Sequence, residues 1–376
     1  MKKILITTKT LAIGGVETSL VFLINKLIND YEIDLLVMDK GELEAKIDKR
    51  VNIILYNSLF PNINLKTKLY NINKNIAVKK LLKMYKNMLN KEYDVSIAYY
   101  GFDNYTDLVA ASVKSKKKII WVHNDFKSAI ETKKFKILYK FMYKLMGRKF
   151  NYFDSYVCVS KYAKQNFDDF FNIDSNKSIC IHNYISENYV IDLSKQSTSV
   201  KLNKGNFNII AIGRLVKSKN FDKIITVVAE LKKKSLPIHL YILGDGPEFN
   251  DLNVLVSNYK ASTYISMLGN QINPYNILKQ ADLLLSMSEF ESFGNILIEG
   301  LILNIPYISN INSGSKEIFE NCTPKGMGII CKNSEVKDKL IEFYNNKDFK
   351  YNKFQIKKYN NEIIDKIYEI IKGQEN

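Results

Sequence analysis

The chain has 376 residues, carries a formal net charge of +16 and is 46% hydrophobic. A chain of this length exceeds what one hydrophobic core supports, so we expect two domains of ordinary size. Its apolar stretches are shorter than the ~20 residues that span a bilayer, so we expect no membrane-spanning segment. The short apolar run after Met1 alternates as a first β-strand does, so we expect no secretory leader. Four cysteines without close-paired spacing are expected to be reduced core residues.

The first half of the chain alternates apolar strands with amphipathic helices. Its first strand enters a Gly14-Gly15 turn, and an apolar helical pattern follows. Alternation of this kind predicts a parallel sheet that binds ligands at the carboxyl ends of its strands. Residues 1–185 are therefore expected to form one Rossmann-like α/β domain. Its strands are predicted at 3–8, 33–38, 94–99, 118–123 and 155–160.

The middle of the chain loses this alternation. Residues 186–205 show no periodicity and are rich in Ser, Lys and Asn, so we interpret them as a linker and hinge. The alternation restarts afterwards and predicts a second Rossmann-like domain over 206–355, followed by a terminal helical segment over 356–376. The strands of the second domain are predicted at 207–212, 239–243, 265–268, 282–286 and 306–309.

The segment from Ser288 to Gly300 carries the strongest functional signal. Glu291 and Glu299 stand on either side of a glycine-containing turn, and an apolar helix start follows the turn. Backbone N–H groups of Phe293, Gly294 and Asn295 would lie at a helix N-terminus, where unpaired donors and the helix dipole favour anions. This pattern suits a nucleotide-sugar, because Glu299 can accept both ribose hydroxyls and Glu291 can bind hydroxyls of the transferred sugar.

Arginine is scarce in this lysine-rich chain. Of the 55 basic residues, only Arg50, Arg148 and Arg214 are arginines. An arginine retained in such a background is a candidate for a site that needs fork geometry, which lysine cannot reproduce. Arg214 follows an apolar strand that ends in glycine, and Lys219 precedes the next helical pattern. The two residues therefore predict a diphosphate clamp made of one bidentate group and one point charge.

Two further candidates lie at predicted strand ends in the first half. Gly14 and Gly15 follow the first strand, where they serve either a ligand or only a tight turn. His123 ends a strand, a position that favours a site role over a structural one. In the second half, Asp245 is expected to fix the turn between two glycines rather than to contact a ligand.

These motifs together resemble the retaining glycosyltransferases of family 4, which have the GT-B fold of two Rossmann-like domains facing each other across a cleft. The resemblance covers nearly the whole chain. One departure lies in Val16-Glu17-Thr18, where the family usually shapes the acceptor side, so the acceptor stays open. The motifs that carry the resemblance are Gly14-Gly15-Val16-Glu17, Trp121-Val122-His123-Asn124, Gly213-Arg214-Leu215 with Lys219-Asn220, Leu243-Gly244-Asp245-Gly246-Pro247, and the pair Glu291 and Glu299.

In the second domain, the resemblance implies that Arg214 and Lys219 bind the donor diphosphate. It assigns the ribose to Glu299, and the donor sugar to Glu291 with help from the backbone of 293–295. Residues 271–273, beginning with Gln271, would line the base pocket through their backbone.

In the first domain, the resemblance implies that Gly15 approaches the diphosphate and that His123 lies near the C6 side of the sugar. In GT-B proteins a final helix often crosses back onto this domain, and the segment 356–376 could do so. These roles are implied by the family and not by the spacing of the residues.

Basic charge is concentrated in the first half of the chain. Residues 1–200 contain 32 basic and 20 acidic side chains, against 23 and 19 in residues 201–376. One lysine-rich run extends from Lys66 to Lys91. In a second, apolar residues recur at helical spacing between lysines from Phe135 to Leu145. That segment is interpreted as a basic amphipathic helix that lies on anionic lipid or packs its apolar face inside the domain. Scarce arginine and the absence of a nucleic-acid-reading motif argue against RNA or DNA.

The implied function is transfer of a hexose or N-acetylhexosamine from a UDP-sugar to a glycan acceptor, which the basic half suggests is lipid-linked. The setting would be capsule, lipopolysaccharide or glycolipid assembly, in the cytoplasm at the inner face of a bacterial cell membrane. Because the chain has no Asp-x-Asp signature, we expect neither a metal nor a cofactor. Two alternatives are a sugar-nucleotide 2-epimerase of GT-B architecture and a non-catalytic membrane-docking protein with the same fold.

Overall fold

A computed structural model describes residues 1–59, 82–83, 85–86, 89–101, 105–126, 130, 135–346 and 351–372. The chain divides into two compact units. The first comprises Met1–Tyr184 and the chain from Asn361 onward, and the second comprises Ile185–Asn360. Much of the lysine-rich run from Lys66 to Lys91 lies outside the described residues.

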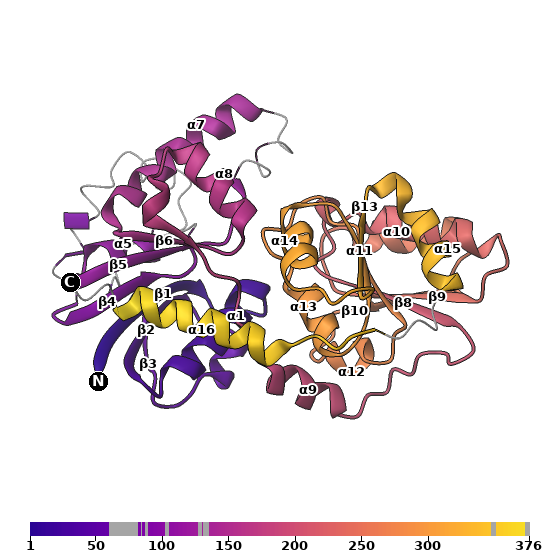
Figure 1. The fold of residues 1–376 in the computed structure, drawn as a ribbon, viewed down its shortest axis with the longest axis horizontal. Coiled ribbons are helices and arrows are strands. Elements are labelled where there is room, and N and C mark those ends of the chain that lie inside the picture. The colour runs from indigo at the N-terminus through magenta and orange to yellow at the C-terminus, as the bar shows by residue number, and fades with distance from the viewer. Residues whose placement is uncertain are drawn as a thin grey trace. The chain divides into compact units, whose positions relative to one another are not determined.

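The first unit is built on a parallel sheet with strand order β3-β2-β1-β4-β5-β6-β7 (Figure 1). The central strand β1 places Ile4 beside Ile33 of one neighbour and Val95 of the other. Its apolar run is fully buried, as expected of a parallel strand covered on both faces. The strands are β1 (Lys2–Thr10), β2 (Tyr31–Asp39), β3 (Asn52–Leu55), β4 (Glu92–Ala98), β5 (Lys114–Val122), β6 (Ser155–Cys158) and β7 (Ser178–Cys180).

Helices connect these strands in the crossover pattern that parallel pairing requires. Helix α8 begins after Ser160, whose hydroxyl accepts a hydrogen bond of 3.0 Å from the N–H of Ala163 and so caps the helix. The described helices of this unit are α1 (Gly15–Leu27), η1 (Glu42–Lys46), α2 (Tyr56–Leu59), α5 (Thr106–Ser112), α7 (Lys136–Met146), η2 (Gly147–Tyr152), α8 (Lys161–Phe171), η3 (Ser175–Lys177) and the larger part of α16 (Ile356–Lys372).

The second unit repeats this plan with the strand order β10-β9-β8-β11-β12-β13, again all parallel. Its strands are β8 (Phe207–Ile212), β9 (Ile238–Leu243), β10 (Ile265–Gly269), β11 (Leu283–Ser286), β12 (Tyr307–Asn310) and β13 (Gly328–Cys331). Its helices are α9 (Glu187–Lys195), η4 (Lys217–Lys219), α10 (Phe221–Lys232), α11 (Phe249–Asn258), α12 (Tyr275–Leu278), α13 (Asn295–Ile302), α14 (Ser313–Asn321), η5 (Asn333–Glu335) and α15 (Val336–Asn345).

In each unit the first strand lies between the second strand and a later one: β1 between β2 and β4, and β8 between β9 and β11. This reversal of strand order is the switch point at which parallel sheets bind ligands. The Gly14-Gly15 turn follows β1, and Gly213-Arg214 follows β8. Both predicted glycine motifs therefore lie at a switch point of their own sheet.

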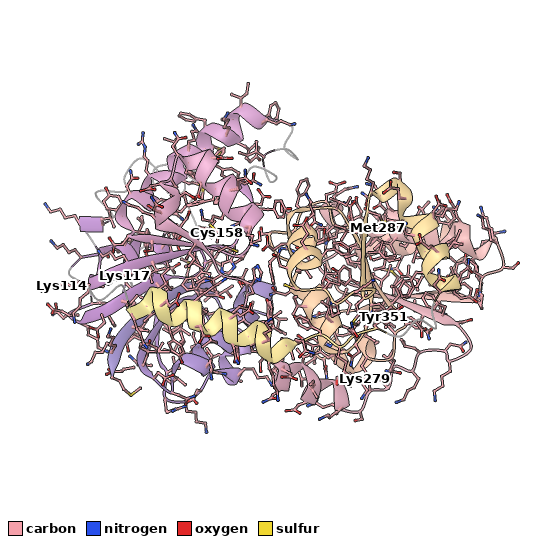
Figure 2. The ribbon with its side chains drawn as sticks, in the orientation of Figure 1. Lys114, Lys117, Cys158, Lys279, Met287 and Tyr351 are labelled. Carbon is pink, nitrogen blue, oxygen red and sulfur yellow. The ribbon has the colours of Figure 1, made fainter. Side chains whose placement is uncertain are left out.

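The cores combine aliphatic and aromatic residues with a few sulfur-containing side chains. Cys158 in β6 and Met287 after β11 lie among packed side chains and are buried (Figure 2). All four cysteines are free thiols, two of them buried and two half-buried. Among the described residues, no helix combines the length and apolar content needed to cross a membrane.

The structure differs from the sequence prediction between residues 186 and 205. Residues 187–195 form α9, which contacts α12 and α13 of the second unit, so this part of the predicted linker is a packed helix. It was missed because α9 is mostly polar and buries only Val190 and Ser194. The short strands β3 and β13 were also missed, since only one of their eight residues is buried.

The last helix, α16, links the two units in the chain. Its residues from Asn361 onward belong to the first unit. There Tyr368 donates a hydrogen bond of 2.5 Å to Asp30, and its ring stacks on Tyr31 at 6.0 Å. The C-terminal segment is thus tied to the start of β2.

Candidate active site

In the second unit, the turns after β8 and β9 interlock backbone against backbone. A Cβ atom on Gly244 would lie 1.9 Å from the carbonyl oxygen of Gly213, and one on Gly246 would lie 2.4 Å from that of Leu215. Only glycine allows this approach. Asp245 accepts a 2.7 Å hydrogen bond from the N–H of Gly246. It therefore fixes the turn, which agrees with its predicted role.

Arg214 directly follows Gly213 in this interlocked turn, and its side chain is exposed. Its flanks are held by Gly213, whose N–H donates to Leu243, and by Leu215, whose N–H donates to Asp245. Within the described part of the chain, the Arg214 guanidinium makes no hydrogen bond or ion pair. A guanidinium that has no protein partner and is carried on a rigid turn at a switch point can bind an incoming diphosphate through two parallel hydrogen bonds. Arg50, in contrast, is paired with Asp48 at 2.8 Å.

Lys219 and Glu291 lie in direct contact and form an ion pair, although 72 positions separate them in the chain. The loop that carries Lys219 is fastened to the loop after β11, since the N–H of Glu289 donates to Ser218 at 2.8 Å and Asn220 donates to Met287 at 2.9 Å. The predicted diphosphate group and the predicted sugar-binding group are thus adjacent. Sequence spacing gave no sign of this pairing.

The turn at 293–295 leads into α13, which begins at Asn295 as predicted. Gly294 has φ = 94° and ψ = 59°, a left-handed conformation that favours glycine. Gly314, at the start of α14, is so close that a Cβ atom there would lie 2.4 Å from the carbonyl oxygen of Phe293. Its N–H donates to the carbonyl of Glu291 at 2.7 Å, so the turn is held from both sides.

Glu299 lies one turn into α13 and is half-buried. Burial raises the pKa of its carboxyl to about 7, and a hydrogen bond from the Tyr275 hydroxyl offsets part of that rise. The ring of Tyr275 meets that of Tyr189 edge to face at 6.3 Å. The two tyrosines, from α12 and α9, were not predicted. Tyr275 gives Glu299 a polar contact, and Tyr189 packs on the ring of Tyr275.

Gln271 and Asn273 lie after β10, where a base pocket was predicted. The side chain of Gln271 folds back and donates a 2.6 Å hydrogen bond to the carbonyl of Leu268. Asn273 donates at 2.8 Å to the carbonyl of Leu193 in α9 and accepts from the N–H of Tyr275. Because both amides serve the loop itself, any contribution of Gln271 to ligand binding would come from its backbone.

In the first unit, Gly14 caps α1 and Gly15 is its first residue. Gly14 is extended, with φ = −165°. The Glu17 carboxylate reaches back over this end, so that a Cβ atom on Gly14 would lie 2.3 Å from its Oε2. Burial raises the pKa of Glu17, and bonding to its own backbone N–H and the charge of Lys9 oppose the rise. The N-terminus of α1, where the resemblance implies that Gly15 approaches the diphosphate, is therefore occupied by a carboxylate of the same helix.

His123 follows β5 and is 8% exposed. Burial lowers the pKa of its imidazole to about 3, so it is neutral at physiological pH; hydrogen bonding with the backbone of Tyr99 opposes the shift. Neither ring nitrogen makes a well-aligned hydrogen bond among the described residues, and the ring packs on Tyr99 at 4.8 Å. A buried polar group in this state is one that a ligand can satisfy.

Further polar groups gather at the same edge of the first sheet and were not predicted. Tyr99, after β4, donates to Ser19 of α1 at 3.3 Å, and Ser19 donates to the carbonyl of Tyr184. The hydroxyls of Thr7 and Thr8 in β1 are buried without a hydrogen-bond partner in the described structure. In the sequence, only the position of Thr7, Thr8 and Tyr99 at the ends of strands could have pointed to these residues. Each unit thus presents its own group of candidate residues.

The comparisons with known proteins agree with this architecture. Residues 13–189 match the model of glycosyltransferase family 4, and residues 193–361 match that of glycosyl transferases group 1. Among solved structures, HepE from Anabaena in complex with UDP and glucose has a TM-score of 0.70 at 15% identity. That alignment covers 98% of this chain and 100% of the other.

Two curated relatives extend the comparison. An uncharacterized glycosyltransferase of Methanocaldococcus jannaschii is 30% identical over 54% of this chain and 50% of its own length. A Campylobacter jejuni N-acetylgalactosaminyltransferase that acts on N-acetylgalactosamine-N,N'-diacetylbacillosaminyl-diphospho-undecaprenol is 25% identical over 63% of each chain. The matched region thus spans about half to two thirds of these relatives. The two family models and the paired parallel sheets place the chain among the glycosyltransferases of GT-B fold.

Proposed function

We propose that this protein is a retaining glycosyltransferase that moves a hexose or N-acetylhexosamine from a UDP-sugar to a lipid-linked glycan acceptor. The observation that carries the proposal is the group of residues in the second unit. It combines an unpaired Arg214, the Lys219–Glu291 pair, a left-handed Gly294 before α13, and Glu299 with its raised pKa. The resemblance to family 4 supports retention at the anomeric carbon.

The chemistry of the proposal follows from these groups. Departure of the sugar leaves negative charge on the diphosphate, which Arg214 and Lys219 would stabilise as fixed cations. Lys219 is paired with Glu291 before the ligand arrives. Diphosphate binding would draw Lys219 away and free Glu291 to accept sugar hydroxyls. Glu299 would hold the ribose, and the diphosphate itself would take the proton of the acceptor hydroxyl.

His123 would act as a neutral polar contact for the sugar, because its low pKa excludes a charged imidazole at neutral pH. The proposal includes no metal and no cofactor, since two cations and a helix N-terminus suffice to neutralise the leaving group. The biological setting we infer is bacterial capsule, lipopolysaccharide or glycolipid assembly. The reaction would take place in the cytoplasm at the inner membrane face.

The test is a transfer assay in EDTA with a panel of UDP-hexoses and UDP-N-acetylhexosamines and a polyprenyl-diphosphate glycan in vesicles. We expect UDP release that depends on the acceptor, with an α-linked product from an α-linked donor by NMR. An inverted product would refute retention. Epimerised UDP-sugar without acceptor would favour the 2-epimerase instead, and activity that requires Mg²⁺ would refute metal independence.

A further inference from the structure

Helix α7 presents its apolar side chains to solvent. None of its residues is buried. Ile137 is 87% exposed and Phe141 61% exposed; Leu138, Met142 and Phe135, which directly precedes the helix, are each at least 41% exposed. A helix on the surface of a globular domain normally turns its apolar stripe inward. The prediction left open whether this stripe packs inside the domain, and the structure shows that it does not.

The side of α7 that packs against the first unit carries Tyr143. The ring of Tyr143 contacts the buried Phe126 edge to face at 5.7 Å, and burial raises the pKa of Tyr143. At about 100° per residue, Phe141 lies about 160° and Leu138 about 140° around the helix from Tyr143. Phe141 and Leu138, at the centre of the apolar stripe, therefore lie on the side of α7 opposite to Tyr143. Figure 1 shows α7 at the periphery of the first unit.

The segment directly after the C-terminus of α7 is packed firmly into the first unit. Directly after α7, Lys149 forms a fully buried ion pair with Asp107 of α5 at 2.5 Å. The next residue, Phe150, is buried and meets Phe167 and Phe171 of α8 edge to face at 4.9 and 4.8 Å. Removing one partner of a buried ion pair is strongly destabilising, so this anchor resists local opening. The exposed stripe is thus carried on a fixed support.

The charged residues of the segment that carries the stripe all have the same sign. Residues 135–152 contain no aspartate or glutamate. Lys140, Lys144 and Arg148 are exposed. None of these three makes a hydrogen bond or ion pair within the described part of the chain. An apolar stripe whose own helix carries only basic charges complements a surface that is apolar below and anionic above, which describes a bilayer of acidic lipid.

We propose that the α7 stripe is a membrane-docking surface whose apolar side chains enter the headgroup region of an anionic bilayer. Lys140, Lys144 and Arg148 would lie among the lipid phosphates. The inference deepens the proposed function, since a lipid-linked acceptor would be met at this surface. It stands on α7 alone, and its test uses no sugar transfer, so either proposal can fail without the other.

The test is flotation of the full chain with phosphatidylcholine vesicles and with equimolar phosphatidylcholine and phosphatidylglycerol vesicles. We expect binding only to the second kind. Phe141→Glu should lower the partition coefficient at least about tenfold, because the exposed ring that would enter the lipid is replaced by a charge that lipid phosphates repel. The matched control is Val254→Glu in α11, which alters a side chain of similar exposure, 59%, in the second unit and should change nothing.

A separate pair of variants tests the contribution of the α7 lysines to vesicle binding. Lys140→Gln with Lys144→Gln should weaken binding about fivefold for each lysine, and the loss should shrink at high salt. The control Lys201→Gln with Lys204→Gln removes two exposed lysines of the second unit and should bind as the wild type does.

Undiminished binding by Phe141→Glu, with a native circular dichroism spectrum, would overturn the proposal. Absence of wild-type binding to acidic vesicles would overturn it too. A wild-type dimer that Phe141→Glu converts to monomer, without any vesicle binding, would assign the stripe to a second copy of the chain and would also refute the membrane.

Discussion

Helices α1 and α13 both begin after a glycine turn, but only one of them begins without an acid in its first turn. At α1, Gly14 is extended and the carboxylate of Glu17 folds back over the helix end. At α13, Gly294 is left-handed and the first turn contains no acidic residue. The comparison teaches that a glycine turn predicts where a helix starts, whereas the side chains of the first turn decide whether an anion can approach it.

The same comparison separates the two units in function. The second unit holds the cationic groups Arg214 and Lys219, and Lys219 is paired with Glu291, four residues before α13 begins. The first unit holds a neutral His123 and a set of hydroxyls next to an end already occupied by Glu17. Diphosphate binding is therefore expected to depend mainly on the second unit. The predictions below test that division.

The largest effect is expected from Arg214→Lys. Lysine keeps the charge but loses the fork, so kcat/KM for transfer should fall about 100-fold. The melting temperature should not change, since Arg214 is exposed and supports no other residue. Kinetics and calorimetric melting are the measurements, with Arg50→Lys, an exposed arginine paired with Asp48, as the control. Unchanged kinetics for Arg214→Lys would show that fork geometry is not used.

The two glycine turns should respond differently to alanine. Gly294→Ala places a Cβ atom in the left-handed region and should lower the free energy of unfolding by about 1–2 kcal/mol. Gly14→Ala should cost less, because its extended backbone suits alanine and the only close neighbour is the flexible end of Glu17. Urea unfolding of both variants measures the difference. Equal costs would contradict the conformations assigned to the two turns.

UDP affinity should depend on pH through Glu299. The ionised carboxylate accepts the ribose hydroxyls, and its pKa is raised to about 7, so affinity should increase as pH rises through 7 and fall about tenfold between pH 8 and pH 6. Glu299→Gln should remove most of this dependence. Titration calorimetry across this range provides the measurement, and a flat profile for the wild type would argue against a carboxylate–ribose contact.

The raised pKa of Glu299 also makes the free energy of unfolding depend on pH. Because the folded pKa lies above the ordinary value of 4.5, the contribution of Glu299 to stability is fully present below that value and is lost as pH rises through about 7. Glu299→Gln should therefore gain stability relative to the wild type above pH 7 and not at pH 4.5. Paired unfolding curves at the two pH values would reveal this difference or its absence.

The smallest effect concerns the first unit. Removing the carboxylate that covers the end of α1, in Glu17→Gln, should tighten UDP binding about two- to fivefold if Gly15 approaches the diphosphate, as the family resemblance implies. Glu187→Gln, which alters an acid in the first turn of α9, is the control. No change in affinity for Glu17→Gln would confine the nucleotide to the second unit.

Much of the fold could be predicted from the sequence, because central parallel strands are continuous apolar runs. Strand β8 was predicted at its observed bounds, 207–212. Marginal elements were missed: β3 and β13 are short and mostly half-buried, and α9 is largely polar. Local pattern carries little information about segments whose position is set by packing against distant residues.

The candidate site was predictable residue by residue but not in its pairings. The sequence pointed to Glu291 and Lys219 separately, yet their ion pair joins loops 72 positions apart. The contact of Tyr275 with Glu299, and the return of Glu17 over Gly14, likewise depend on tertiary geometry. Motif spacing identifies which groups are present, whereas the protonation and pairing of those groups follow from burial.

The proposed function requires a nucleotide site in the second unit that is specific for UDP. The most direct measurement is titration calorimetry of UDP, GDP and ADP in EDTA with the wild type, Glu299→Ala and Val254→Glu as the control. We expect UDP alone to bind to the wild type and to Val254→Glu, with loss of most affinity in Glu299→Ala. Equal affinity of the wild type and Glu299→Ala for UDP would contradict this expectation, as would an absence of nucleotide binding.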